Sequence, residues 1–193
     1  MQTYKFRSIT LVAAMAACSL AFVGCTTTKS ANDSGSSSRA STDAQVSAAL
    51  SKLYSTVPSS RELVSKAAGV LVFPQVVGAS LGVGAEYGRG ALLTGGKTEA
   101  YYSTTQGSLG FQAGAQSKAV IYLFNTQDAL NKFRNSNGWT AGADATVAVA
   151  KIGANGAIDT QSIRQPVVSF VLTNVGLEAG VSVSGSKITK VNM

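Results

Sequence analysis

The sequence of 193 residues contains no histidine, and only nine of its side chains are carboxylates. Without histidine the chain has no Ser-His-Asp or Cys-His catalytic arrangement, and no zinc site that depends on an imidazole ligand. No two carboxylates stand at a spacing that indicates a paired general acid and base. We therefore expect a protein that is not an enzyme, with no cofactor and no metal site.

Cysteine is also scarce. Cys18 and Cys25 both lie in the N-terminal segment, so the rest of the chain has no disulfide. Two basic residues precede an apolar run over residues 9–23, which is short for a membrane-spanning helix of about 20 residues. The run ends in a small residue before Cys25, the pattern of a bacterial lipobox. This pattern predicts a signal peptide at residues 1–24 and a lipid on Cys25. Lipidation at Cys18, or cleavage without a lipid, are the alternatives.

The residues that follow Cys25 contain little that could be buried. Neither of the first two is aspartate, which favours sorting to the outer membrane, with the domain facing the periplasm or the cell surface. The Ser- and Thr-rich composition predicts a flexible tether at residues 25–42, with a reach of roughly 20–25 Å. The remainder, residues 43–193, is long enough for one domain with its own core.

Negative charge is scarce as well, and the net charge of the chain is +7. Two of the cations lie in the predicted signal peptide, so the exported chain keeps about +5. A basic protein on a lipid tether is typical of attraction to anionic headgroups, and a basic surface that serves only solubility is the alternative. No cluster of basic residues interleaves with aromatics, so nucleic acid is not an expected partner.

Two helices are predicted at the start of the domain. Thr42 and Gln45 have the spacing of a capping box, and apolar residues follow at helical spacing until Pro58. Ser59 and Glu62 form a second capping box, which opens a shorter helix. The apolar stripe of this amphipathic pair could lie on a bilayer, but such a stripe more often packs onto the sheet of its own domain.

The period of the apolar pattern then changes to two. A short strand at residues 70–73 is predicted to end at Pro74, and clear alternation follows over residues 79–87, 109–116 and 175–184. In each of the three alternating segments glycines recur on one face. They indicate strong curvature of the sheet or the close approach of another element.

Turns and one further helix complete the predicted fold. The turns are expected at residues 88–90, 95–96, 137–138 and 155–156. The helix is expected at residues 127–134, after an apolar run at residues 120–124. The fold class is therefore predicted to be α+β, with a curved antiparallel β-sheet or partial barrel on which the N-terminal helices and the further helix pack.

Two glycine-rich stretches resemble nucleotide-binding loops. Residues 82–88 have the glycines of a dinucleotide loop, but they lie inside an alternating strand and not between a strand and a helix. Residues 95–98 resemble the end of a P-loop, but the first glycine of that motif is missing and a strand-like sequence follows. Neither stretch predicts a nucleotide site. Trp139 is expected in the core.

Several motifs in order resemble the SYLF lipid-binding domain. They are residues 67–74, residues 82–90, Tyr101-Tyr102, residues 114–117, Gly138-Trp139 and residues 157–160. The resemblance covers residues 51–190 and implies non-catalytic binding of phosphoinositides or other anionic lipids. Eukaryotic relatives also bind actin and carry SH3 domains. This chain has no SH3 domain, and actin is not an expected partner of an exported bacterial protein.

Five basic residues are the candidates for lipid contact. Lys52, Arg61 and Lys66 fall on the polar faces of the predicted helices. Arg89 and Lys97 fall at predicted turns, where a charged tip can reach a headgroup. The sequence thus predicts a membrane-anchored lipoprotein that binds anionic lipids. A cell-envelope protein that binds a protein or polymer partner is the alternative.

Overall fold

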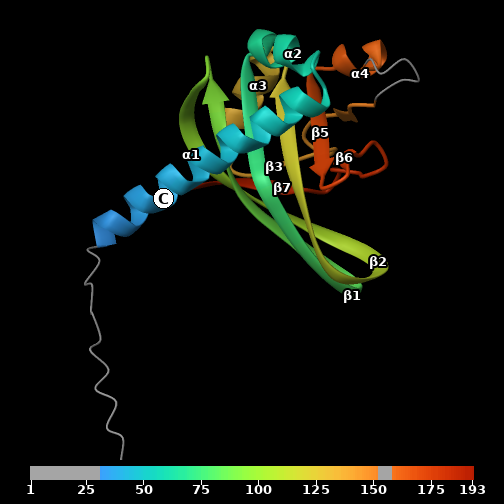
Figure 1. The fold of residues 1–193 in the computed structure, drawn as a ribbon. Coiled ribbons are helices and arrows are strands. Elements are labelled where there is room, and N and C mark those ends of the chain that lie inside the picture. Colours follow the sequence, from blue (N-terminus) through green and yellow to red (C-terminus); the bar gives the residue numbers. More distant parts are fainter. Residues whose placement is uncertain (1–30, 152–157) are drawn as a thin grey trace, which may run out of the picture.

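The computed structural model describes residues 31–151 and 158–193, which form an α+β fold (Figure 1). The described helices are α1 (Ala31–Thr56), α2 (Ser60–Lys66), α3 (Gln127–Arg134) and α4 (Thr160–Ile163). The described strands are β1 (Gly69–Thr94), β2 (Lys97–Phe124), β3 (Trp139–Thr140), β4 (Val147–Val149), β5 (Val167–Thr173), β6 (Gly176–Leu177) and β7 (Lys187–Val191). All seven strands belong to one sheet, so the predicted fold class is confirmed. The predicted signal peptide, Cys25 and the turn at residues 155–156 lie outside the described residues.

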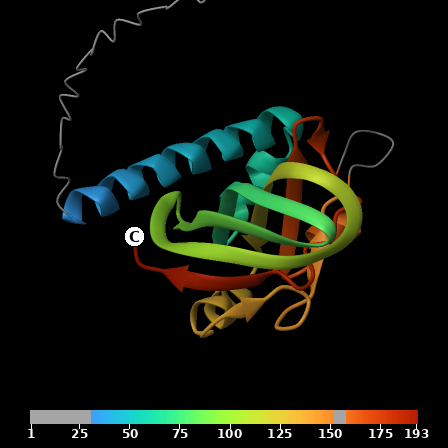
Figure 2. The same ribbon diagram turned by 90° about the horizontal axis from the view of Figure 1, so that it is seen from below.

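A long hairpin of β1 and β2 dominates the sheet. Both strands bend back near register irregularities at Ser80, and the bend forms the tip at the lower end of Figure 1. Viewed from below, the hairpin curls into a half-barrel (Figure 2). β7 pairs with the first half of β2 and β5 with its second half. β4 pairs with β5 in parallel, so the sheet is mixed and not wholly antiparallel as predicted.

The bend brings the two halves of β1 close together. A Cβ atom on Gly90 would lie 2.0 Å from the carbonyl oxygen of Val72, and one on Gly88 would lie 2.8 Å from that of Gln75. Real Cβ atoms do not approach a backbone oxygen so closely, so only glycine fits at Gly90 without movement of the backbone. The one-sided glycines therefore allow the curvature that their spacing predicts.

β1 does not end at Pro74, and the predicted turn at residues 88–90 is wrong, because both lie inside this one strand. A register shift between Phe73 and Val76 accommodates the proline, which has no N–H to donate to the ladder. Residues 109–116 and 120–124 are likewise parts of the single strand β2. β1 continues through the bend because glycine has no Cβ, so the two halves of β1 can approach each other without an intervening turn.

The remaining turns and α3 follow the prediction. Gly95 and Gly96 have φ values of +57° and +77° and close the β1–β2 hairpin. Gly138, with a φ of +136°, precedes β3. α3 has the predicted bounds, and the side chain of its N-cap residue Thr126 accepts a hydrogen bond from the amide of Ala129 at 3.2 Å.

The predicted strand at residues 175–184 is wrong over most of its length, since only Gly176–Leu177 pairs as β6. β5, which the sequence analysis does not identify, is buried from Val167 to Leu172. A strand covered on both faces has a continuous apolar run and no alternation, so a search for period two misses it.

α1 begins at Ala31, so the prediction of a flexible tether is wrong from that residue onward. Thr42 is therefore not an N-cap, and its hydroxyl donates to the carbonyl oxygen of Ser38 one turn earlier, at 3.0 Å. Tertiary contacts explain why a polar segment is helical. Arg39 donates to the carbonyl oxygen of Met193 at the C-terminus, and Thr42 is 8% exposed against the fold.

The shorter helix is confirmed, and Ser59 is its N-cap residue as predicted. The capping box itself is not formed, because the Ser59 side chain makes no capping hydrogen bond and the residue has α-helical backbone angles. The turn that leads into α2 is held instead by the buried hydroxyl of Ser60, which donates to the carbonyl oxygen of Val57 at 2.6 Å.

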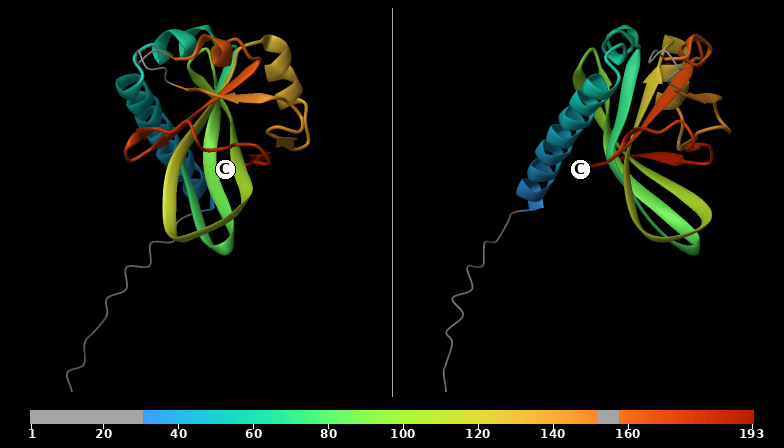
Figure 3. Two further views of the ribbon diagram at one scale, coloured as in Figure 1. Left: turned by 90° about the vertical axis from the view of Figure 1, so that its right-hand side faces the viewer. Right: turned by 45° about the vertical axis from the view of Figure 1, so that its right-hand side comes forward.

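The core lies on both faces of the sheet. The apolar stripe of α1 packs on one face, with Val46 and Leu53 at most 2% exposed, so it is buried in its own domain and not free for a bilayer (Figure 3). On the other face α3 and the segment after it cover an aromatic cluster around Trp139, which is 2% exposed. The Trp139 ring meets those of Phe124 and Phe133 at centroid distances of 6.1 and 5.6 Å.

Candidate functional site

A groove of about 720 Å³ opens where α1 and α2 meet the β1–β2 turn. Figure 1 places α2 and this turn at one end of the molecule, and the bend of β1 and β2 near Ser80 at the other end. The apolar lining residues are Leu50, Val64, Ala67, Val70 and Leu93. The polar lining residues and the turn glycines are Ser47, Ser51, Tyr54, Arg61, Ser65, Gly95 and Gly96. The groove is thus mainly apolar, with hydroxyl groups and one cation.

Arg61 is the charged member of this lining. Its guanidinium carbon lies 4.6 Å from the centroid of the Tyr54 ring, a cation–π contact that holds the charge beside the groove. Burial raises the pKa of the Tyr54 phenol, and the charge of Arg61 partly offsets this rise. Within the described part of the chain, Arg61 forms no ion pair with a carboxylate, so its charge is available to an anion.

Two further predicted residues lie at the same end of the molecule. Lys66 of α2 pairs with Glu62 at 2.5 Å, and both side chains are about 70% exposed. The hydrogen bond and the charge of Lys66 hold the pKa of Glu62 below its usual range. Lys97 is exposed and directly follows Gly96 of the groove lining, at the hairpin turn where the sequence predicts it. Arg61, Lys66 and Lys97 therefore form a group at one end.

Lys52 and Arg89 do not belong to this group. Lys52 lines a smaller groove of about 310 Å³ on another side of α1, where its ammonium donates to the carbonyl oxygen of Thr173 at 2.8 Å. Arg89 lies within β1 and not at a turn. Its Nε donates to the hydroxyl of Tyr87 at 2.9 Å, and this bond raises the pKa of the arginine.

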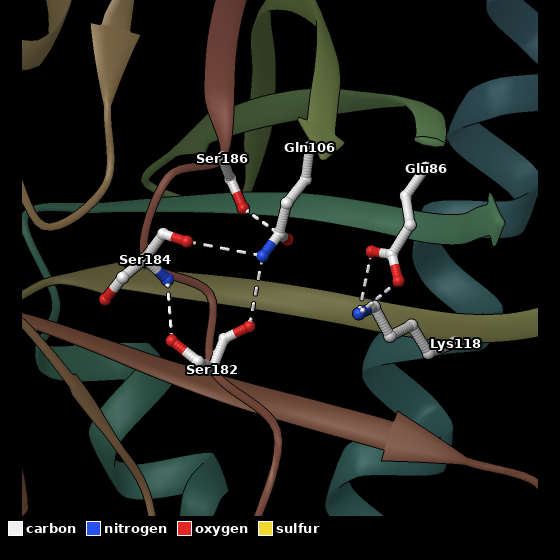
Figure 4. A network of polar contacts seen from close by, with 6 residues as sticks. All are labelled: Glu86, Gln106, Lys118, Ser182, Ser184 and Ser186. Atoms are coloured by element: carbon white, nitrogen blue, oxygen red, sulfur yellow. Dashed lines mark hydrogen bonds and ion pairs between the residues drawn. The ribbon is translucent and has the colours of Figure 1, made fainter. Parts of the chain in front are cut away.

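A second polar cluster lies inside the bent hairpin (Figure 4). Glu86 of β1 pairs with Lys118 of β2, and the two side chains are only 18% and 13% exposed. Gln106, the ladder partner of Glu86, donates to the carbonyl oxygens of Ser182 and Ser184, each at 3.3 Å. The Glu86–Lys118 pair therefore joins β1 to β2 at the bend, and Gln106 separately joins β2 to the segment before β7.

No group of three or more acidic or cysteine side chains in residues 31–151 and 158–193 could hold a metal ion. Within the same ranges, no helix is both long and apolar enough to span a membrane. The arrangement that remains is an apolar groove with a positive edge, which suits an amphiphilic anion.

Sequence reasoning identified Arg61 but missed the groove beside it. Leu50 and Tyr54 belong to the apolar residues at helical spacing before Pro58, together with Val46 and Leu53. In the structure Leu50 and Tyr54 are only partly buried and line the groove. The spacing of this stripe is that of an ordinary surface helix, so the sequence carries no signal of the groove.

Comparison with known proteins agrees with the motifs in the sequence. Residues 105–192 match the model of a family described as Ysc84, Las17-binding protein actin regulator. No curated protein matches the chain. The matched segment extends from β2 to β7 and includes most of the described strands. Residues 105–192 thus match the Ysc84 (SYLF) domain family, which is lipid-binding and actin-regulatory.

Proposed function

We propose that the chain is a lipoprotein, anchored through Cys25 to the outer membrane, whose SYLF domain binds anionic lipids without catalysing a reaction. The observation that carries this proposal is Arg61, a cation without a carboxylate partner in the described part of the chain, beside an apolar groove. Lys66 and Lys97 add positive charge at the same end. Actin regulation is not part of the proposal, because an exported bacterial protein does not meet actin.

Charge and not helix insertion is the expected source of membrane affinity. The apolar stripe of α1 is buried in the sheet, so it cannot enter a bilayer unless the domain opens. Each exposed cation near an anionic surface contributes about 1 kcal/mol, and salt screens this contribution. Three cations together thus give weak binding, which a lipid anchor would strengthen by keeping the domain near its membrane.

Vesicle flotation tests the proposed function. Residues 26–193 contain every described element and lack Cys25, so binding by this protein reports on the domain alone. We expect flotation with phosphatidylglycerol vesicles at low salt, less at moderate salt, and none with phosphatidylcholine vesicles. Failure to float with anionic vesicles at low salt would remove lipid binding and favour a protein or polymer partner in the envelope.

Charge reversal tests the site. Arg61→Glu should strongly reduce flotation, whereas Arg89→Glu, which makes the same change of charge at an exposed position of β1 outside the groove lining, should reduce it much less. Equal losses of flotation in the two variants would show that membrane binding depends on the total charge of the protein and not on the position of Arg61.

The anchor needs its own experiment. Cells fed labelled palmitate should incorporate it into the full chain and into a Cys18→Ser variant, but not into a Cys25→Ser variant. Labelling that is lost in the Cys18→Ser variant would place the lipid on Cys18 and not on Cys25. Absence of label from all three proteins would contradict lipidation and favour cleavage of the signal without a lipid.

A further inference from the structure

Three elements around the groove leave apolar side chains partly uncovered. Leu50 of α1, Val64 of α2 and Leu93 of β1 are partly buried. Residues one turn away on α1, such as Leu53, are completely buried. The uncovered side chains face a common space, because all three line the groove. An apolar site that adjacent elements enclose but do not fill is suited to an apolar ligand.

The size and charge of the groove narrow the class of ligand. Its volume of about 720 Å³ lies within the range of roughly 300–1,000 Å³ that is usual for small-molecule sites. Its charged lining residue is Arg61, which the Tyr54 ring positions. Guanidinium groups bind carboxylates and phosphates through two parallel hydrogen bonds. One apolar space and one cation match a molecule with one chain and one anionic head.

We propose that this groove binds a single-chain anionic amphiphile of the fatty-acid class, with its acyl chain between α1 and α2 and its carboxylate on Arg61. The proposal rests on the lipid-binding function above and adds to it. Headgroup binding leaves every acyl chain in the bilayer, whereas groove binding removes one chain from water or from the bilayer. Ser51 adds a further hydroxyl to the groove lining, whereas the hydroxyls of Ser47 and Ser65 already donate to the carbonyl oxygens of Asp43 and Glu62.

Binding of dodecanoate below its micelle concentration, measured by isothermal titration calorimetry on residues 26–193, tests this proposal. No vesicle is present, so surface attraction cannot produce the signal. We expect one saturable site, and much weaker binding of dodecanol, which has the same chain without the charge. Absence of saturable dodecanoate binding would overturn the proposal.

A matched pair of substitutions places the site. Ser51→Trp fills the groove from an exposed position of α1, and we expect a loss of affinity of roughly tenfold or more, about 1.4 kcal/mol. Ser55→Trp puts the same side chain one turn further along α1, outside the lining residues, and should change the affinity little. Circular dichroism and thermal unfolding of both variants would show that the fold is kept. Equal affinities of the two variants would contradict the site.

A second pair tests the headgroup contact. Arg61→Gln should weaken dodecanoate binding severalfold and leave dodecanol binding unchanged, whereas Lys132→Gln removes an exposed charge of α3, on the other face of the sheet, and should affect neither. If Arg61→Gln weakens both ligands equally, the guanidinium does not bind the carboxylate.

The same proteins separate the two proposals. Ser51→Trp should still float with phosphatidylglycerol vesicles, because it keeps every cation. If the unsubstituted protein floats but does not bind dodecanoate, binding to anionic membranes is supported and the groove proposal is wrong. If it binds dodecanoate but does not float, the groove proposal is supported and binding to anionic membranes is wrong.

Discussion

The carboxylate of Glu86 and the ammonium of Lys118 lie 2.8 Å apart although the two residues are not ladder partners. Glu86 pairs with Gln106 across the hairpin, and Lys118 pairs with Val76. The ion pair therefore connects the two halves of the hairpin that lie on either side of the bend (Figure 4). It forms only when β1 and β2 fold back, so it should stabilise the half-barrel specifically.

Glu86→Gln should destabilise the protein, because it leaves the ammonium of Lys118 largely buried without its counter-charge. We expect the free energy of unfolding, measured in urea, to fall by about 1–3 kcal/mol. The control is Glu62→Gln, which breaks an ion pair between two side chains that are about 70% exposed. Its cost should stay below about 0.5 kcal/mol. Equal costs would mean that the buried pair does not hold the bend.

Gly90→Ala should be among the most damaging single-methyl substitutions in the chain. The added Cβ would lie 2.0 Å from the carbonyl oxygen of Val72, a backbone atom that cannot rotate away. Overpacking of this kind costs about 1–3 kcal/mol, which thermal unfolding would show as a lower melting temperature. Gly107→Ala, where nothing lies within 4 Å of the new methyl group, is the matched control and should be nearly neutral. A neutral Gly90→Ala would argue against the observed curvature of β1.

The same glycines show how far the sequence could predict this fold. Their one-sided spacing indicates close approach, because glycine geometry is a local property. It does not reveal that β1 continues past Pro74, since a register shift depends on the partner strand. β5 was missed because its run from Val167 to Leu172 is buried on both faces and lacks alternation. The two failures, at Pro74 and at β5, both concern strands, where pairing over long sequence distances decides the structure.

The candidate site was predictable only in part. The sequence predicts Arg61 only as one of five basic candidates, on the polar face of a predicted helix. The groove beside it requires α1, α2 and the turn at Gly95 and Gly96 to meet, and no local pattern encodes that meeting. Lys97 was placed correctly because two glycines specify a hairpin turn. Arg89 was misplaced because glycines that permit bending resemble glycines that form a turn.

Glu99 should make the stability of the fold depend on acid pH. Burial raises the pKa of this carboxyl, but hydrogen bonds from Thr94 and Arg134 and the charges of Arg134 and Lys190 together lower it below its ordinary value. A carboxyl with a lower pKa in the folded state stabilises the fold above its unfolded pKa of about 4.3, and this contribution is lost as the pH falls through the folded pKa.

Urea unfolding of the unsubstituted protein and of Glu99→Gln at several pH values tests this expectation. The unsubstituted protein should be more stable at neutral pH, by less than about 1 kcal/mol because the Glu99 side chain is 40% exposed. The difference should shrink below about pH 4. Arg134→Gln should remove most of the same pH-dependent difference. A difference that stays constant down to the lowest pH would mean that the Glu99 carboxylate has no favourable partner in the fold.

The N-terminal half of α1 should behave as a rigid arm and not as a flexible tether. Hydrogen exchange measured by mass spectrometry should show slow exchange at residues 36–42, because the side chains of Ser38 and Arg39 both hydrogen-bond to the C-terminal residue Met193. Arg39→Ala should accelerate exchange there but leave residues 46–53 protected, since Val46 and Leu53 remain buried. If these residues of the unsubstituted protein exchange as fast as an unfolded peptide, the segment is a flexible tether and not a rigid arm. The whole of α1 has 26 residues and is roughly 39 Å long, so its length separates the N-terminal side, on which the proposed anchor lies, from α2 and Arg61. A rigid α1 restricts how Arg61 and the anchor can reach one membrane, so loosening the arm should alter the flotation of the lipidated chain but not that of residues 26–193.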